Sequence, residues 1–361
     1  MLPATPMTSP TRPQLTIDLA AIAANYRLIA TRTAPAEVSA VVKADGYGLG
    51  ARPVARVLAA AGCKTFFVAH VEEGAELRPE IRAATIFVLN GFVPEHKHLF
   101  AEHNLAPVLS SAQHVANWKA SGLANAHALH FDTGMARLGL GERDIDPALA
   151  MAKPVLVMSH LASSDDPEHE QNQAQLARFK TLSLRFPNVP LSLAASGGCF
   201  LGSHYAFDLV RPGVALYGGN PGNGPQNPMR AVVTLTAPLL QVRSIDRGCT
   251  VGYGATYAAS GPRRLGIAAM GYADGLMRSL SNRGHGVIAG IKCPIVGRVS
   301  MDLVTLDVTA VPENATHAGT SVEFISPHQT VDDLARDAGT MAYEIYTRLG
   351  PRIERRYTGT H

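Results

Sequence analysis

The sequence is poor in cysteine and tryptophan, and this shortage limits what the protein can be. Its 361 residues include 4 cysteines and 1 tryptophan, and no two cysteines form a C-x-x-C pair. Disulfide scaffolds and structural zinc sites need several cysteines at fixed spacings, so we expect neither, and no other metal site. Reduced thiols favour a cytoplasmic location.

Long apolar runs and dense runs of one charge are also missing. The first residues, MLPATPMTSPTRPQ, contain no continuous apolar stretch, so residues 1–13 are expected to form a flexible tail and not an export signal. No run approaches the roughly 20 apolar residues that cross a bilayer. The net charge of +3 comes without a basic run interleaved with aromatics. We therefore expect neither a membrane nor a nucleic acid as partner.

From Leu15 to about Val233, short β-type runs alternate with amphipathic helical segments. Some eight repeats of strand and helix are typical of a TIM barrel, which we assign to residues 14–233. An open doubly wound sheet is the alternative, weakened because no G-x-G-x-x-G follows the first strand. The expected strands are 38–42, 65–69, 85–89, 106–109, 128–131, 155–158, 191–194 and 209–216, and Asp18 is expected to cap a preceding helix over 19–31.

After about Met229 the pattern changes. Apolar runs such as VVTLTAPLLQVRSI, CPIVGRV and LVTLDVT are separated by Gly, Pro and Asn, and helical periodicity returns only at VDDLARDAG. This texture predicts a separate C-terminal all-β domain over residues 234–361.

The most informative segment is AVVKADGYGLG, residues 40–50. A strand rich in β-branched residues ends at Lys43 and is followed by a turn rich in Gly and Tyr. In a barrel, the carboxyl end of a strand opens onto the active-site face. A sheltered lysine there has a lowered pKa and can form a Schiff base with an aldehyde cofactor.

Seven further segments follow in order: DTGMARLG (132–139), SHLASSD (159–165), RPGVALYG (211–218), VGYGATY (251–257), GYADG (271–275), VGRVSMD (296–302) and AYE (342–344). With the lysine string, they resemble the alanine racemase family over almost the whole chain. The resemblance implies a (β/α)₈ TIM barrel that binds pyridoxal 5′-phosphate (PLP), followed by a C-terminal β domain. It also implies a homodimer with shared sites that interconverts L- and D-alanine and supplies D-alanine for peptidoglycan.

The resemblance implies residues that hold the cofactor. Its phosphate is a dianion and needs donors, which backbone N–H groups in Gly- and Ser-rich loops supply. By resemblance these donors come from Ser196, Gly213 and Val214, with the hydroxyls of Tyr47 and Tyr343. Arg211 is expected to face the pyridine nitrogen and, being permanently charged, to leave it unprotonated. Lys43 carries the cofactor.

Racemisation needs two acid/base groups on opposite faces of the substrate Cα. By resemblance these are Lys43 and Tyr253, with His160 contacting Tyr253 and linking it to Arg211. The substrate carboxylate is expected to meet Arg137 and the backbone N–H of Met301. The entrance is expected to be lined by Tyr272, Tyr343, Arg298, Asp165 and Arg278.

Two positions depart from the family's pattern. His130 stands where the family usually has a carbamylated lysine whose negative charge braces the arginine that Arg137 matches. An imidazole cannot supply that charge, which leads to the hypothesis that a bound anion such as chloride, or another carboxylate, holds Arg137. Ala195 replaces an asparagine next to the phosphate serine and removes one donor.

Three alternatives remain from the sequence. A serine or broad-spectrum racemase has the same architecture. A PLP decarboxylase for basic amino acids shares it too, but generally pairs the pyridine nitrogen with a carboxylate, unlike Arg211. A non-catalytic PLP carrier resembles the barrel alone and lacks the domain that carries Tyr253 and Met301.

Overall fold

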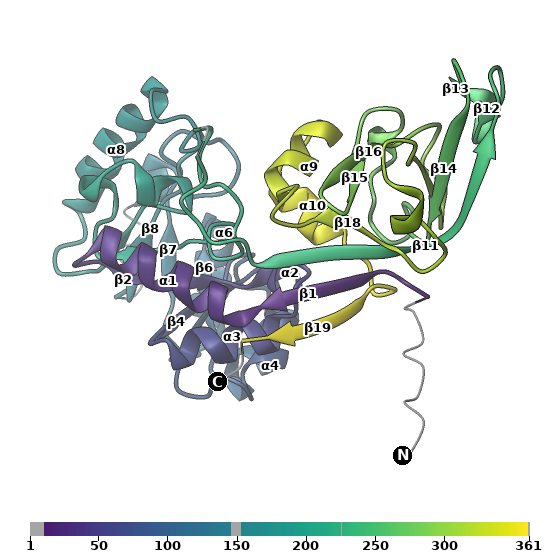
Figure 1. Cartoon of the computed structure of the whole chain (residues 1–361). Helices are drawn as coiled ribbons and strands as arrows, with labels where there is room; N and C mark the ends of the chain where they lie inside the picture. Colours follow the sequence, from purple (N-terminus) through teal and green to yellow (C-terminus); the bar gives the residue numbers. More distant parts are fainter. Residues whose placement is uncertain (1–10, 146–152, 225, 360–361) are drawn as a thin grey trace. The chain divides into compact units, whose positions relative to one another are not determined.

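The computed structural model describes residues 11–145, 153–224 and 226–359 (Figure 1). By internal contacts the chain divides into residues 19–230, which we call the barrel unit, and residues 1–18 with 231–361, which we call the β unit. Most of the expected tail, residues 1–10, lies outside the described residues. From the sequence we place the start of the barrel at residue 14 and the start of the β domain at residue 234. These boundaries remain a proposal and differ from the division by contacts.

A seven-stranded parallel sheet forms the centre of the barrel unit. Its strands are short and buried, as expected for a sheet covered by helices. In sheet order they are β3 (Ala40–Val41), β4 (Thr65–Val68), β5 (Thr85–Val88), β6 (Ala106–Leu109), β7 (Ala128–His130), β8 (Leu156–Met158) and β9 (Leu191–Ser192).

An eighth strand, β10 (Leu209–Val210), closes this sheet into a barrel. On one side β10 pairs in parallel with β2 (Glu37–Val38), which continues into β3 after Ser39. On the other side the Arg211 N–H donates to the Ala194 carbonyl at 2.9 Å, and Ala195 and Arg211 form a parallel bridge. The expected TIM barrel is therefore confirmed; β6 has the predicted bounds, and the other strands are shorter than predicted.

Helices alternate with these strands. They are α1 (Leu19–Thr33), α2 (Lys43–Tyr47), α3 (Ala51–Ala60), α4 (Val71–Leu77), α5 (Lys97–Glu102), α6 (Ala112–Ser121) and α8 (Glu170–Ser183), with 3₁₀ turns η1 (Pro94–His96), η2 (Glu142–Asp144), η3 (Gly197–Phe200) and η4 (Ser203–Tyr205). Local sequence sets both ends of α6. At its start the Ser111 hydroxyl accepts from the His114 N–H, and at its end Gly122 lies in the left-handed region at φ 67°.

The β unit is built on an eight-stranded sheet. Its strands are β1 (Gln14–Asp18), β11 (Val233–Ile245), β14 (Arg263–Ala268), β15 (His285–Ile288), β16 (Ile291–Pro294), β17 (Val304–Asp307), β18 (Ser321–Ile325) and β19 (Glu354–Thr358). The hairpin of β12 (Thr250–Val251) and β13 (Tyr257–Ala258) stands beside it, as do the turns η5 (Tyr253–Ala255), η6 (Arg278–Leu280) and η7 (Glu313–Ala315). The expected C-terminal β domain is confirmed, but it is mostly β and not all-β, because it also contains two helices.

The first strand of the chain belongs to this unit. Figure 1 shows β1, in purple, between β11 and the yellow β19. Leu15 lies opposite Leu235 in antiparallel register and opposite Arg355 in parallel register. Leu15 and Ile17 are fully buried. Residues 14–18 thus belong to the β unit, because their apolar side chains are buried where β1 pairs with β11 and β19.

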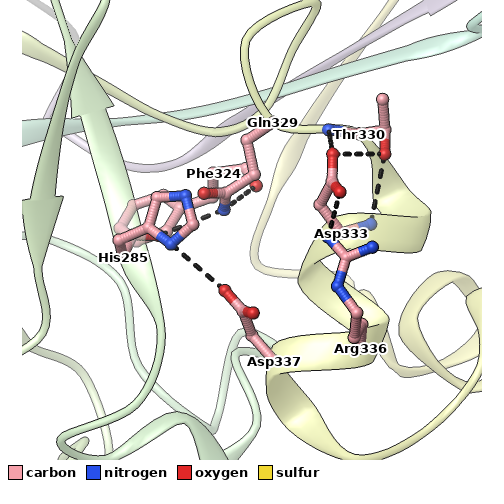
Figure 2. Close-up of polar contacts among 7 residues, drawn as sticks. All are labelled: His285, Phe324, Gln329, Thr330, Asp333, Arg336 and Asp337. Atoms are coloured by element: carbon pink, nitrogen blue, oxygen red, sulfur yellow. Dashed lines mark hydrogen bonds and ion pairs between the residues drawn. The ribbon is translucent and has the colours of Figure 1, made fainter.

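Two helices of the β unit, α9 (Val331–Ala338) and α10 (Ala342–Arg348), follow β18. At the start of α9, Thr330 and Asp333 bond each other's backbone N–H groups at 3.1 and 3.0 Å (Figure 2). This capping box satisfies donors that a helix start leaves open. Figure 2 also shows the His285 Nδ1 paired with Asp337 at 3.1 Å, which ties β15 to the end of α9.

Of the helices in the described part of the chain, none has the length and apolar character needed to cross a membrane.

Candidate active site

Five basic side chains gather at one end of the barrel unit. Lys43 follows β3, His130 ends β7, Arg137 lies in the next loop, His160 follows β8 and Arg211 follows β10. The charges of this group act on one another: Arg137 acts on Lys43, and Arg211 acts on both histidines. Parallel strands bring their carboxyl ends to one rim, which is why residues so far apart in sequence meet here.

Lys43 begins a strained turn. Ala44, Asp45 and Gly46 all have left-handed backbone angles, with φ of 53°, 51° and 61°, and Tyr47 follows at 58°. Each residue with a side chain costs roughly 1–2 kcal/mol in this region, and such strain concentrates at functional sites. Burial and the charge of Arg137 lower the pKa of the partly buried Lys43 amine. More of the amine is then uncharged and nucleophilic near neutral pH.

Arg211 is held by neutral acceptors. It is 3% exposed, and its guanidinium donates to the Ser192 hydroxyl, to the Ser159 carbonyl at 2.5 Å and to the Leu193 carbonyl at 3.4 Å. Burial lowers its pKa to about 10, so it stays charged at neutral pH. Among the residues that the structure describes, no carboxylate forms an ion pair with it.

The two histidines are uncharged near neutral pH. Burial, then Arg211 and Arg137, lower the pKa of His130 to about 4, although Asp132 acts in the opposite direction. Burial and the surrounding basic groups lower the pKa of His160 to about 3. The rim therefore combines fixed positive charge with neutral imidazoles, an arrangement that favours an anionic ligand.

A compact cradle of hydroxyl and backbone N–H groups adjoins this rim. The Ser196 hydroxyl accepts from the N–H groups of Gly213 at 2.9 Å and Ala215 at 3.3 Å. The buried Tyr47 hydroxyl lies so close to Gly213 that a Cβ there would come within 2.1 Å of its oxygen. Val214, next along the chain, is fully buried. The structure thus brings together four of the residues expected at a phosphate.

Asp165 and Ala195 complete the expected residues of the barrel unit. Asp165 is exposed, and its carbonyl accepts from the Asn223 N–H at 2.8 Å. Ala195 bridges to Arg211 and accepts through its carbonyl from the Cys199 N–H at 3.1 Å.

In the β unit, Tyr253 is 72% exposed on the short turn η5 between β12 and β13. Backbone geometry, and not packing, therefore sets its position. Gly252 and Gly254 both have φ of 73°, and a Cβ on Gly254 would come 3.0 Å from the Arg298 guanidinium. Arg298 therefore lies against the Tyr253 turn.

Asn282 fastens this turn to the loop of Arg298. Its side-chain amide donates to the Thr256 hydroxyl at 3.2 Å, and its oxygen accepts from the Gly297 N–H at 2.6 Å. The neighbouring Ser281 hydroxyl accepts from the Val299 N–H at 3.0 Å. Sequence reasoning missed Asn282, because nothing local indicates which loops its amide would join.

Met301 and Tyr272 lie on two turns bonded backbone to backbone. The Tyr272 N–H donates to the Ser300 carbonyl at 3.0 Å and the Ala273 N–H to the Met301 carbonyl at 2.9 Å. Met301 is 54% and Tyr272 44% exposed. A Cβ at Gly271 would come within 2.3 Å of the Met301 carbonyl, so only glycine permits this approach.

Arg352 clamps the same two turns through carboxylates. Its Nε lies 3.0 Å from the fully buried Asp274, and its Nη1 lies 2.7 Å from Asp302, the residue after Met301. Asp274 also accepts from the Gly271 N–H at 2.9 Å. Neither Asp274 nor Arg352 was among the expected site residues.

The remaining expected residues also lie on the β unit. Arg278 and Tyr272 line a hollow of about 470 Å³ together with Arg348. Tyr343, on α10, is 40% exposed. Across residues 11–145, 153–224 and 226–359, His, Cys, Asp and Glu side chains nowhere gather in threes that could hold a metal ion.

Comparison with known proteins identifies the family of the chain. The family model "Alanine racemase, N-terminal domain" matches residues 17–221, and "Alanine racemase, C-terminal domain" matches residues 232–357. The chain belongs to the alanine racemase family. It is therefore an isomerase, and the family resemblance seen in the sequence is confirmed.

Individual relatives cover nearly the whole chain. An alanine racemase of Brucella canis is 47% identical over 95% of this chain and 93% of its own length, and a catabolic alanine racemase of Agrobacterium fabrum is 46% identical over 95% and 91%. The crystal structure of the Bartonella henselae alanine racemase with covalently bound pyridoxal phosphate matches with TM-score 0.92 and 40% identity, covering 97% of this chain and all of that one. Matches to both alanine racemase domains argue against a barrel-only PLP carrier.

Proposed function

We propose that this chain racemises alanine with PLP held on Lys43, using Lys43 and Tyr253 as its two acid/base groups within a homodimer. The observation that carries the proposal is the positive charge gathered around a half-buried lysine at the barrel rim. Lys43, Arg137 and Arg211 face this region with two neutral imidazoles. An aldehyde cofactor with a phosphate, and a substrate with a carboxylate, both suit it.

The residues present fit PLP. A phosphate dianion matches the Ser196 hydroxyl, the Gly213 N–H and the Tyr47 hydroxyl, which lie together. Val214, next along the chain, is proposed to add its own N–H group. Tyr343 is proposed as a further phosphate donor. The Bartonella henselae relative holds the same cofactor covalently. Bound PLP supplies an electron sink that acidifies the substrate Cα–H.

Arg211 limits that sink. Its fixed charge, held by Ser192 and by the carbonyls of Ser159 and Leu193, is proposed to face the pyridine nitrogen and keep it unprotonated. A weaker sink shortens the lifetime of a carbanion and so disfavours side reactions such as transamination. The absence of an ion-paired carboxylate within the described residues also argues against a decarboxylase that would protonate this nitrogen.

Two groups must exchange a proton with Cα on opposite faces. Lys43 is suited because its lowered pKa leaves it able to accept a proton. Tyr253 is proposed for the other face, with His160 and Arg211 beside it to stabilise the phenolate. His160, uncharged at neutral pH, still carries one ring N–H that can donate a hydrogen bond to the phenolate oxygen.

The substrate carboxylate is proposed to lie between the Arg137 guanidinium and the Met301 N–H. Tyr272 and Tyr343 narrow the entrance, and Arg298, Arg278 and Asp165 surround it. Two phenols leave room for a small side chain, which favours alanine. Serine is the near competitor, because an apolar pocket rejects one added hydroxyl poorly.

A second copy of the chain is proposed to complete the site. The β unit exposes Tyr253, Tyr272, Met301, Leu303, Met341 and Tyr343. So many large apolar side chains need covering, and a subunit carrying its own barrel rim would cover them. A cytoplasmic enzyme that supplies D-alanine for peptidoglycan is the proposed biological role.

The test is a panel of L-amino acids incubated with purified protein, with formation of the D-enantiomer followed by a coupled D-amino-acid oxidase. L-alanine should be racemised fastest, with L-serine next. Lys43→Ala and Tyr253→Phe should each lose at least about a hundredfold in kcat, whereas the matched controls Lys64→Ala and Tyr357→Phe should retain activity. Equal activity in all four variants would contradict the proposal.

A further inference from the structure

The carboxylate of Glu73 joins the Lys43 turn to the next strand of the barrel. One oxygen accepts from the Ala44 N–H at 2.7 Å. The other accepts from the N–H groups of Ala69 at 2.7 Å and His70 at 3.1 Å. Three backbone donors thus converge on one side chain, two of them where β4 passes into α4 and one directly after Lys43.

The bond to Ala44 lies where the backbone most needs support. Ala44 is the first residue of the left-handed turn, and its N–H belongs to the peptide group that leaves Lys43. At the other end of the turn, Asp45 accepts from the Ala51 N–H at 2.8 Å. Glu73 thus fixes the start of the turn and Asp45 its end. A strained segment keeps one conformation only when its surroundings over-determine it.

Glu73 also brings charge. Its negative charge raises the pKa of Lys43, against the stronger effects of burial and Arg137. Of the described residues, the other charged group that acts on this amine is Arg137, which lowers its pKa. Asp45, in the same turn, is engaged with Ala51.

We propose that Glu73 is a positioning residue for Lys43: its carboxylate fixes the Lys43–Ala44 peptide so that the amine points into the rim, and its charge balances the cationic surroundings of that amine. This proposal rests on the proposed role of Lys43. Because Glu73 acts through the backbone and the electric field, it touches neither substrate nor cofactor. It governs how readily the amine takes up and returns a proton.

The test compares Glu73→Gln with Glu72→Gln. Glu72 is exposed, lies on the same helix and approaches His96 at 3.6 Å, so it is a matched control. In the apoenzyme, Lys43 is labelled with trinitrobenzenesulfonate across a pH series and the labelled peptide is quantified by mass spectrometry. Hydrogen exchange of the Ala44 amide is measured in the same samples.

Loss of the negative charge should lower the pH midpoint of Lys43 labelling by about 1 unit in Glu73→Gln. Ala44 amide exchange should accelerate about tenfold or more. Glu72→Gln should change neither. Glu73→Asp, one methylene shorter, should keep the labelling midpoint but lose protection at Ala44, which separates charge from geometry and serves if Glu73→Gln does not fold. An unchanged midpoint together with an unchanged Ala44 exchange rate would overturn the proposal.

A kinetic signature distinguishes positioning from simple stabilisation. In the holoenzyme, slowing the Lys43 step in Glu73→Gln should raise the Cα-deuterium isotope effect for one alanine enantiomer and lower it for the other. A merely structural role would lower the melting temperature and leave both isotope effects alone. If Lys43→Ala keeps racemase activity, the proposed function itself fails. If Lys43→Ala is inactive while Glu73→Gln matches the native protein throughout, only this inference fails.

Discussion

The Tyr47 hydroxyl occupies the space that a side chain on Gly213 would need. A Cβ at Gly213 would come 2.1 Å from the Tyr47 oxygen and 2.8 Å from its Cζ. The Tyr47 ring packs on Tyr217 with centroids 4.6 Å apart, so it cannot simply swing away. Gly213 is therefore a glycine because a phenol and a backbone N–H must lie side by side here.

This relationship predicts that Gly213→Ala weakens PLP binding. Tyr47 must move, and a phosphate then loses a hydroxyl donor, so we expect roughly a 10- to 100-fold increase in the PLP dissociation constant, about 1.4–3 kcal/mol. Fluorescence titration of the apoenzyme with PLP measures this. Gly224→Ala is the control, because nothing lies within 4 Å of a Cβ at Gly224. Equal affinity in both variants would show that the cradle does not hold the phosphate.

The clamp at Arg352 predicts a substrate-binding defect. Arg352→Met removes the partner of the buried Asp274 and of Asp302, so the turn carrying Met301 loosens. KM for alanine should rise about five- to tenfold, with a smaller change in kcat. Arg356→Met, which removes an exposed pair with Glu354, should leave KM unchanged. A purely kcat effect in Arg352→Met would contradict a role in holding the carboxylate donor.

Asn282→Ala should loosen the turn that carries Tyr253, just as Arg352→Met should loosen the turn that carries Met301. The Asn282 side-chain nitrogen and oxygen bond the two loops that flank the exposed Tyr253, through Thr256 and Gly297. We expect kcat to fall about tenfold with little change in KM, and no further fall when Asn282→Ala is added to Tyr253→Phe. Additive losses in the double variant, read from steady-state kinetics, would show that Asn282 acts elsewhere.

Buried histidines predict acid sensitivity. The folded-state pKa of His130 lies below its unfolded value near 6.5, so the unfolded chain binds more protons and stability falls as pH drops from about 6.5 to about 4. His130 alone should account for a loss on the order of 3 kcal/mol by pH 4. Urea unfolding from pH 7.5 to 4.5 measures it. His130→Gln should flatten the slope, and an identical slope would refute this origin.

Much of the site could be predicted because its signals are local. The AVVKADGYGLG string identifies Lys43 and Tyr47 without reference to any other element, and strand–helix alternation predicts the barrel. The pairing of β1 with β11 and β19 could not be predicted, since Leu15 and Ile17 are buried by strands from the opposite end of the chain.

Glu73 shows the same limit at the level of one side chain. Sequence indicates an acidic residue in the first turn of a helix, a common position for capping its own N–H groups. Its third partner, the Ala44 N–H, comes from another strand end and becomes visible only when parallel strands are brought side by side. Long-range contacts of this kind, such as those of Asn282 and Arg352, carry no local signal.

The most direct test of the two-base account is Cα exchange in D₂O. Starting from either alanine enantiomer, the native enzyme should place deuterium almost entirely in the product at early times, because separate groups remove and return the proton. Tyr253→Phe should still exchange the Cα hydrogen of one enantiomer without inverting it, while leaving the other unexchanged. Equal exchange of both enantiomers by Tyr253→Phe, or racemisation at the native rate, would contradict the account.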